Sequence, residues 1–219
     1  NTWEYKSHII RTKILPFFGE RKIAEIEPKD VIAWQNEMLA YKGENGEAYS
    51  PTYLKTIHSQ LSAIFNHAVR YCHLPSNPAQ KAGSMGSEEH KEMLFWTKEE
   101  YLKFADVMMD KPVSYYAFEM LYWTGIRCGE LLALTPKDFN FERQELTINK
   151  SYQRLNGRDV ITTPKTKKSN RTIKMPKFLC EEMQEYMGML YEVGEDERLF
   201  KITKSYLHHE MDRGAKIAG

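Results

Sequence analysis

Arg127 lies between Gly125 and Gly129, inside an otherwise apolar stretch that spans residues 121–132. The apolar neighbours predict a buried guanidinium, and a buried charge needs an anionic partner because its desolvation is costly. Glycine lets the backbone turn sharply or approach a partner closely, as a site for a phosphate or carboxylate requires. Two interpretations follow: a functional anion site, or a helix–turn–helix joint in which Arg127 pairs with Glu130.

A run of bases is the second feature that could do chemistry. Between residues 143 and 177, ten lysines and arginines stand against two acids, Glu145 and Asp159, although the whole chain has a net charge of only +1. Such a local excess attracts polyanions. A solvated charged loop is the alternative, and it is the usual outcome for runs of this kind.

Two further groups could bind a metal or act as a nucleophile. His208, His209 and Glu210 are adjacent, but neighbours on a helix point in different directions, so no zinc site is expected. Cys128 follows Arg127, and a nearby cation lowers the pKa of a thiol. A structural cysteine is favoured, because no histidine base is close in sequence. The chain has no Walker phosphate loop and no G-x-G-x-x-G, which argues against nucleotide-driven chemistry.

Composition predicts a globular protein in a reducing compartment. The 219 residues are 42% hydrophobic and 28% charged, which suits one domain or two modest ones. No apolar run approaches the roughly 20 residues of a membrane span. The three cysteines are far apart and odd in number, unlike a disulfide framework or a cysteine zinc site. The chain starts at Asn1 without a visible signal peptide, so we expect a trimmed N-terminus.

The first third of the chain has the pattern of three helices that would position a binding surface. Residues 3–16 and 28–42 have helical spacing, and the third helix begins with Ser50 as its cap and Pro51 at its first position. Its apolar face runs from Tyr53 to Cys72. Ser50, Thr52, Lys55 and Ser59 lie off that face, as groups that can contact phosphates and base edges. A solvated helix face is the alternative for these residues.

The remainder predicts a linker and a second domain. Residues 79–93 have no apolar period and read as a linker. Thr97 and Glu100 form a capping box, and Trp96 can pack as a staple on Tyr101. Helices are expected over residues 113–123 and 130–134, on either side of Arg127. Three antiparallel strands with turns at 156–157 and 165–170 should follow, and then helices from residues 179 and 203.

These elements define the expected fold class. It is mainly α with a small antiparallel sheet, in a helical domain over residues 1–78, a linker over 79–93 and a second domain over 94–219. No internal repeat or low-complexity tract is present.

Residues 124–134, followed by strands whose turn contains Pro164, Lys165 and Thr166, resemble the tyrosine recombinase or phage integrase family. The likeness is greatest to the integrases of conjugative transposons, and it covers nearly the whole chain. The resemblance implies a helical core-binding domain followed by the first part of an α+β catalytic domain of this family. The chain therefore looks truncated at both ends.

The resemblance also implies a reaction. Such enzymes break a DNA phosphodiester through attack by a tyrosine, keep the strand as a phosphotyrosine and rejoin it, so that no nucleotide, metal or other cofactor is needed. Arg127 matches the first catalytic arginine, which stabilises charge on the phosphate oxygens. Glu130 matches the acid that orients this arginine. Lys165 matches the general acid for the leaving oxygen, with Lys167 and Lys168 as alternatives.

The family's histidine-x-x-arginine box and nucleophilic tyrosine have no counterpart after Arg171. Tyr186, Tyr191 and Tyr206 precede the place where that box is expected. We therefore expect a chain that binds recombination-site DNA and does not cleave it alone.

Double-stranded DNA is the partner that the resemblance implies. The expected contacts are Ser50, Thr52, Lys55 and Ser59 in the first domain and Arg154, Lys167, Lys168, Asn170 and Arg171 in the second. A two-domain clamp on the duplex and self-assembly of the full-length protein on DNA are expected, in the cytoplasm at the nucleoid, with no membrane contact and no small-molecule substrate. A non-catalytic DNA-binding regulator and a helical protein-interaction module remain as alternatives.

Overall fold

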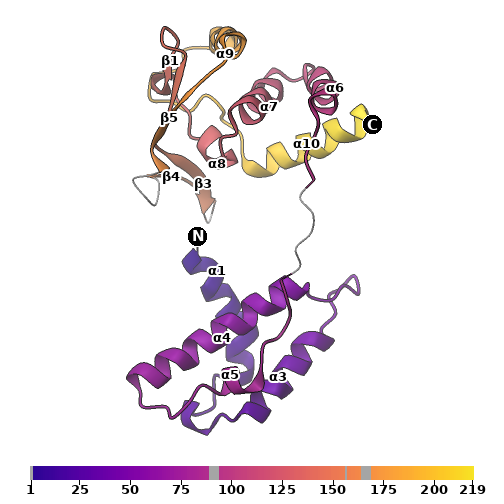
Figure 1. Ribbon diagram of the computed structural model, residues 1–219, viewed down its shortest axis with the longest axis vertical. Coiled ribbons are helices and arrows are strands. Elements are labelled where there is room, and N and C mark those ends of the chain that lie inside the picture. Colours follow the sequence, from indigo (N-terminus) through magenta and orange to yellow (C-terminus); the bar gives the residue numbers. More distant parts are fainter. Residues whose placement is uncertain (1, 89–93, 156, 164–168) are drawn as a thin grey trace. The chain divides into compact units, whose positions relative to one another are not determined.

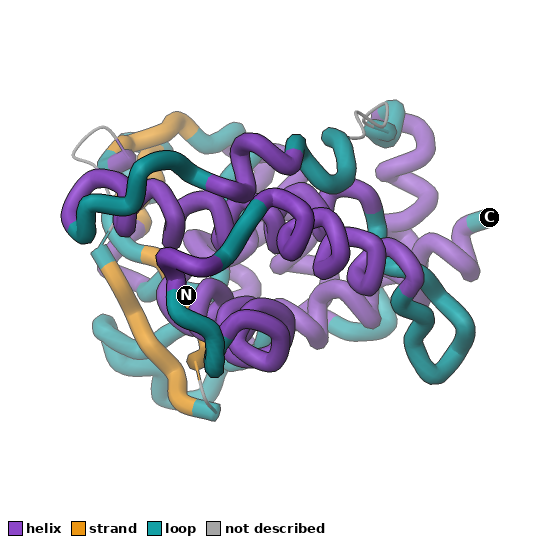
Figure 2. Tube along the Cα trace, turned by 90° about the horizontal axis from the view of Figure 1, so that it is seen from below, coloured by secondary structure: helices purple, strands orange, loops and turns teal. Residues whose placement is uncertain are grey.

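The computed structural model describes residues 2–88, 94–155, 157–163 and 169–219. The chain divides into two compact units, residues 1–93 and 94–219, whose elements are labelled in Figure 1. Helices make up most of the trace and strands a small part (Figure 2). Among the described residues, no helix combines the length and apolar character that crossing a membrane requires.

Among the described residues of the first unit, the regular elements are all helical apart from an isolated bridge between Lys42 and Ala48. Its elements are α1 (Thr2–Ile9), the π-helical turn η1 (Ile10–Ile14), α2 (Leu15–Phe18), the 3₁₀ turn η2 (Ile23–Glu25), α3 (Pro28–Ala40), α4 (Pro51–Tyr71) and α5 (Pro78–Ala82). The single helix expected over residues 3–16 is therefore interrupted. Pro16 has no N–H to donate to the preceding turn, and a widened turn accommodates that loss.

The core of the first unit forms around Trp34, which is fully buried and donates its indole N–H to the carbonyl of Lys13 at 2.8 Å. The predicted apolar face of α4 is correct in its middle, where Ile57, Leu61 and Phe65 are buried. The predicted apolar face is wrong at the C-terminal end of α4. Val69 and Cys72 are exposed because the last turn of α4 extends beyond the packed core.

The segment expected to be a linker begins inside the first unit. Asn77 caps α5 by accepting hydrogen bonds from Ala79 and Gln80 N–H, and Ala79 and Met85 are buried at 0% and 3% exposure. Gln35 of α3 also donates to the carbonyl of Gly83 at 2.8 Å. Two apolar side chains and a capped turn are enough to hold this segment, although no helical period is visible in it.

The second unit combines helices with two small sheets. Its helical elements are α6 (Lys98–Met108), α7 (Pro112–Thr124), α8 (Cys128–Leu131), the 3₁₀ turn η3 (Pro136–Asp138), α9 (Lys177–Met189) and α10 (Lys204–Ala218). The capping box of Thr97 and Glu100 is present as predicted. Trp96 packs its ring against Phe104, with 4.8 Å between ring centroids, one turn beyond the expected partner Tyr101.

The strands differ from the single three-stranded sheet that the sequence predicts. β1 (Phe139–Asn140), β2 (Glu145–Ile148) and β5 (Arg171–Lys174) form one antiparallel sheet in the order β1-β2-β5, whereas β3 (Ser151–Leu155) and β4 (Arg158–Thr162) form a separate hairpin. The chain leaves the first sheet at Lys150, whose ammonium binds the buried Asp138 at 2.6 Å. The turn of this hairpin falls between the paired residues Leu155 and Arg158, as predicted, with Gly157 at φ +76°.

The core of the second unit brings α10 against α6 and α7 against α9. Phe104, Met108, Leu131, Leu146, Leu179 and Phe200 are all buried. Leu131 of α8 belongs to this core, so the turn that carries Arg127 is anchored immediately after it.

Gly214 lies where α10 packs closely against α6. A Cβ at this position would clash with the Phe104 ring and lie 2.6 Å from the sulfur of Met108. We expect Gly214→Ala to destabilise the second unit by roughly 1–3 kcal/mol, as overpacking does. Gly188→Ala in α9 is the matched control, because no heavy atom lies within 4 Å of its Cβ; it should be neutral or stabilising. Urea unfolding measures both, and an equally stable Gly214→Ala protein contradicts the expectation.

Candidate functional site

The turn between α7 and α8 places Arg127 at a helix start. Gly125 ends α7 in the left-handed region at φ +63°, and its N–H bonds the carbonyl of Leu121 at 3.0 Å. A residue with a side chain is strained at that φ, which gives this glycine its role. Ile126 then enters the core at 5% exposure, and Arg127 occupies the cap position of α8 with an extended backbone.

The second glycine of the motif allows α8 to approach β3. A Cβ on Gly129 would lie 2.6 Å from the hydroxyl oxygen of Ser151 and 3.0 Å from the carbonyl oxygen of Tyr152. A side chain in that space would require the Ser151 hydroxyl to move and the backbone of β3 to shift slightly. Because glycine has no side chain, the β3–β4 hairpin can pack closely against α8, whose first turn follows Arg127.

The prediction that Arg127 is buried is wrong. Its side chain is 76% exposed, while Ile126, Leu131 and Leu132 take the buried positions. The apolar residues around Arg127 belong to the inward faces of two helices, whereas Arg127 lies at the cap between them. Its guanidinium therefore remains accessible to a ligand without first being desolvated.

Glu130 binds both the backbone and the side chain of Arg127. Its side chain is only 7% exposed, and its two oxygens accept from the Arg127 backbone N–H at 2.9 Å and from the Arg127 Nη1 at 3.0 Å. The internal pairing that the sequence suggested is thus present, and it coexists with an accessible guanidinium.

Arg171 completes the cluster from β5. Its Nη1 and Nη2 donate to the two oxygens of Glu130 at 3.1 and 2.8 Å. Burial alone would raise the pKa of Glu130, but the hydrogen bonds from Arg171 and Arg127 outweigh it and hold that pKa at about 2. At neutral pH one ionised carboxylate therefore faces two guanidinium groups.

A concave surface opens beside these arginines. Gly125, Arg127, Ser169 and Arg171 line a cavity of about 380 Å³. Two positive charges against one carboxylate leave one net positive charge at its wall. Guanidinium groups bind phosphate and carboxylate oxygens in planar, directional pairs, so this cavity has the chemistry of an anion site.

The other predicted residues of the second unit are only partly described. Lys165, Lys167 and Lys168 lie outside the described residues. Asn170 is exposed immediately before β5. Arg154 is exposed on β3, with its Nε 3.9 Å from Asp159.

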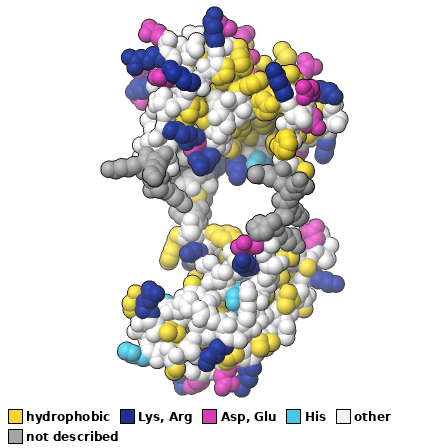
Figure 3. Space-filling view, viewed as in Figure 1, with side chains coloured by type: hydrophobic (Ala, Val, Ile, Leu, Met, Phe, Trp, Pro, Cys, Tyr) yellow, Lys and Arg dark blue, Asp and Glu magenta, His cyan; other side chains and the backbone are white. Residues whose placement is uncertain are grey.

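The basic excess of residues 143–177 is partly neutralised in the folded unit. Lys150 pairs with Asp138, Lys174 with Glu145 and Lys177 with Glu181. Figure 3 shows lysine and arginine side chains over the strand-bearing side of the second unit, with acidic side chains among them. These acidic partners therefore moderate the positive field that the sequence suggested.

The residues predicted for DNA contact in the first unit share the N-terminal part of α4. Ser50 caps the helix by accepting from Tyr53 N–H, Lys55 binds Glu88 at 2.7 Å, and Ser59 donates to the carbonyl of Lys55. Thr52 is exposed. These residues form one surface within the first unit, whereas Arg127, Glu130 and Arg171 belong to the second.

The alternative sites have structural explanations. Glu210 is buried and paired with Lys111 at 2.7 Å and Arg213 at 2.9 Å. Burial raises the pKa of the Cys128 thiol, with only a partial offset from Lys204. Across the described ranges, no group of three or more histidine, cysteine, aspartate or glutamate side chains could hold a metal.

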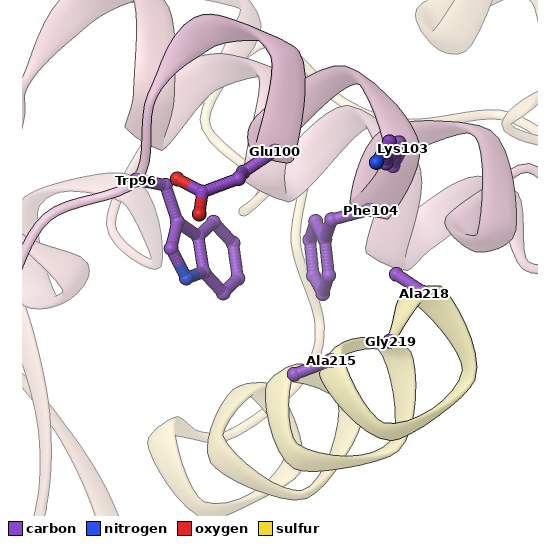
Figure 4. Close-up of a pocket in the computed structure, with 7 residues that line it drawn as sticks. All are labelled: Trp96, Glu100, Lys103, Phe104, Ala215, Ala218 and Gly219. Carbon is purple, nitrogen blue, oxygen red and sulfur yellow. The ribbon is translucent and has the colours of Figure 1, made fainter.

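A pocket between α6 and the end of α10 contains none of the predicted site residues. Trp96 and Phe104 present their rings toward α10, near Ala215 and Ala218 (Figure 4). Its lining also includes one acid, Glu100, and one base, Lys103. With balanced charge, this pocket lacks the anion-binding character of the Arg127 cavity.

Sequence reasoning missed the contact between Arg171 and Glu130. It took Arg171 only as a nucleic-acid contact. The two residues are 41 positions apart, and no local period or motif spacing links them.

Two family descriptions match the chain. The phage integrase N-terminal SAM-like domain matches residues 1–39, and the phage integrase family matches residues 95–214. The ICEBs1 integrase of Bacillus subtilis (strain 168) is 30% identical over 187 residues, which cover 85% of this chain and 49% of that protein. The transposase from transposon Tn916 of Enterococcus faecalis is 30% identical over 164 residues, 72% of this chain and 38% of that protein. The chain thus spans about half the length, or less, of these relatives.

Solved structures show the same fold. The Tn1549 transposon integrase in complex with a circular intermediate DNA has a TM-score of 0.74 at 20% identity, covering 93% of this chain and 64% of that one. A lambda integrase tetramer bound to a Holliday junction has a TM-score of 0.66 at 20% identity, covering 100% of this chain and 58% of that one.

Proposed function

Because the chain belongs to the phage integrase family of tyrosine recombinases, we propose that it binds recombination-site DNA for site-specific integration and recombination of a mobile element. The expected fold class, a helical core-binding domain with an integrase catalytic domain, is confirmed. So is the likeness to integrases of conjugative elements.

The Arg127 cluster is the observation that carries this proposal. The guanidinium of Arg127 is exposed and is bound by the buried carboxylate of Glu130. It lines a cavity together with a second arginine, Arg171. In the proposed reaction Arg127 binds the non-bridging oxygens of the scissile phosphate, where negative charge develops as a tyrosine attacks. Glu130 supports that orientation. Lys165 donates the proton to the leaving oxygen, with Lys167 and Lys168 as alternatives.

Both units take part in the proposed binding. Residues 1–78 serve as the core-binding domain through Ser50, Thr52, Lys55 and Ser59, and residues 94–219 contribute the first part of the catalytic domain with Arg154, Lys167, Lys168 and Asn170. The two domains would hold the duplex as a clamp. Contacts of these types position a protein on the DNA backbone.

Salt dependence tests the DNA binding directly. A chain that neutralises six or more phosphates should lose roughly a thousandfold or more in affinity between about 50 and 200 mM salt. Fluorescence anisotropy with a labelled duplex and the 219-residue chain measures this loss. Binding that is unchanged over that range, or absent at low salt, contradicts the proposal and favours a helical protein-interaction module.

We also propose that these 219 residues lack the nucleophile. Tyr186 is 3% exposed and donates to the carbonyl of Leu199, and burial raises its pKa to about 12. The hydroxyl of Tyr206 lies 3.0 Å from that of Ser114. Tyr191, although 87% exposed, follows α9 and precedes the place of the family's tyrosine.

A nicked suicide substrate tests this second part. Cleavage on such DNA releases a short strand and traps any phosphotyrosine link, so the 219-residue chain should give no covalent adduct. A trapped adduct, located by mass spectrometry on any tyrosine of the chain, contradicts the assignment. Absence of an adduct together with salt-dependent binding is the expected result.

Assembly on DNA is the final element of the proposal. The lambda integrase relative is a tetramer on a Holliday junction, and we propose that the full-length protein also self-assembles on its recombination site, at the bacterial nucleoid. Sedimentation of the protein with and without site DNA tests this, and a single copy per full site argues against it.

A further inference from the structure

We propose that Arg171 is a positioning residue, which holds Glu130 and through it fixes the guanidinium of Arg127. The inference rests on the proposed function for its biological meaning, because the group so positioned is the one assigned to the DNA phosphate. The contacts themselves are independent of that assignment. They concern three side chains from the α7–α8 turn, α8 and β5.

The carboxylate of Glu130 is held from two sides. Arg171 contacts both of its oxygens through two separate nitrogens, at 3.1 and 2.8 Å. Arg127 contacts the same two oxygens through its backbone N–H at 2.9 Å and its Nη1 at 3.0 Å. Four donors match the roughly four lone-pair sites of a carboxylate. Glu130 therefore cannot rotate without losing bonds to both arginines.

Arg127 alone would not secure this geometry. Its pair with Glu130 is an i, i+3 contact in which the arginine side chain is 76% exposed, and exposed pairs of this kind contribute little, about 0–1 kcal/mol. A mobile carboxylate would leave the arginine with many orientations. A bidentate pair from Arg171 removes that freedom, and the fork geometry is specific to arginine because the lysine ammonium is a single point.

The backbone of Arg171 is itself held in register. Arg171 opens β5, where it is the partner of Ile148 on β2, and the neighbouring pair Leu146 and Ile173 ties the strands to the core. Ile148 is 1% exposed. The sheet thus supplies a rigid support for the arginine that clamps Glu130.

A direct DNA contact fits Arg171 less well. Its side chain is 32% exposed, against 76% for Arg127. Both of its terminal nitrogens are already used by Glu130, and Nη1 also lies 3.4 Å from the carbonyl oxygen of Ser169. These bonds take three of the five N–H donors of the guanidinium, so a phosphate could reach only the other two.

The test uses the 219-residue chain with the variant Arg171→Lys, which keeps the charge and removes the fork. Side-chain NMR relaxation of the Arg127 Nε–H group, without DNA, reports its order, and a carboxyl titration reports the pKa of Glu130. We expect Arg127 to become as mobile as an exposed arginine and the pKa of Glu130 to rise. Affinity for DNA should stay within about twofold, as for a substitution that removes no direct contact.

Arg154→Lys is the matched control, because Arg154 is an exposed arginine of the neighbouring hairpin whose nearest acid is 3.9 Å away. It should leave the order of Arg127 and the pKa of Glu130 unchanged. If Arg171→Lys also leaves both unchanged, the positioning role is wrong. If it weakens DNA binding well beyond twofold with Arg127 still ordered, Arg171 contacts DNA instead, because only the bidentate fork has been lost.

A second variant covers the case in which Arg171→Lys does not fold. Glu130→Gln keeps the shape of the side chain and removes its charge, and it should loosen the guanidinium groups of both Arg127 and Arg171. If Arg171 stays ordered in that variant, something other than Glu130 holds it and the inference fails. A wild-type chain that binds no DNA contradicts the proposed function and leaves these NMR results interpretable.

Discussion

Replacing Arg127 by alanine is expected to reduce DNA strand cleavage by on the order of a hundred- to a thousandfold, the range found when a single stabilising donor is removed from a charged transition state. The assay needs a longer form of the protein that carries the family's nucleophilic tyrosine. Binding should change little by comparison, since many other cations hold the DNA backbone. Single-turnover cleavage of a bound suicide substrate, with affinity measured separately, gives the two quantities.

Loss of folding would not account for this effect. The Arg127 side chain is 76% exposed, and loss of such an exposed partner of an ion pair costs about 0–1 kcal/mol. Arg154→Ala is the matched control, as another exposed arginine, and should retain cleavage of bound DNA. If Arg127→Ala loses binding to the same extent as cleavage, the arginine serves binding and its catalytic role is misplaced.

Replacing Glu130 by alanine is expected to destabilise the second unit by roughly 2–4 kcal/mol. Removing one member of a buried ion pair leaves its partners uncompensated, which typically costs about 3–5 kcal/mol, and the value is lower here because Arg127 is largely in solvent. Urea unfolding at neutral pH measures the change. Glu181→Ala is the control, since that carboxylate is 62% exposed in its pair with Lys177, and it should change stability by about 0.5 kcal/mol or less.

The same residue predicts an acid-side dependence of stability. The pKa of Glu130 is about 2 in the folded chain against an ordinary 4.5, so the folded state binds fewer protons than the unfolded state between these values. Its contribution is complete above pH 4.5 and is lost as the pH falls toward 2, by up to about 3 kcal/mol. Glu130→Gln should remove this part of the pH dependence. A variant with the wild-type acid profile contradicts the assigned contacts.

The features that the sequence predicted correctly are those built from neighbouring residues. The capping box of Thr97 and Glu100, the cap at Ser50, the hairpin turn at Gly157 and the pairing of Arg127 with Glu130 all involve residues within a few positions of each other. Hydrogen bonds at helix ends and the φ values open to glycine depend on local backbone geometry. The amino-acid types at those positions are therefore enough to predict them.

Only the tertiary structure decided which groups the site exposes and which it clamps. Arg127 is in an apolar segment and yet lies in solvent, because burial depends on which faces of α7 and α8 meet the core. Arg171 reaches Glu130 from 41 positions away, through the pairing of β5 with β2 and the close approach of α8 to β3 at Gly129. Ala79 and Met85 join the first core for the same reason. Contacts between residues that are far apart in sequence depend on how the whole chain packs, and local sequence patterns do not predict that packing.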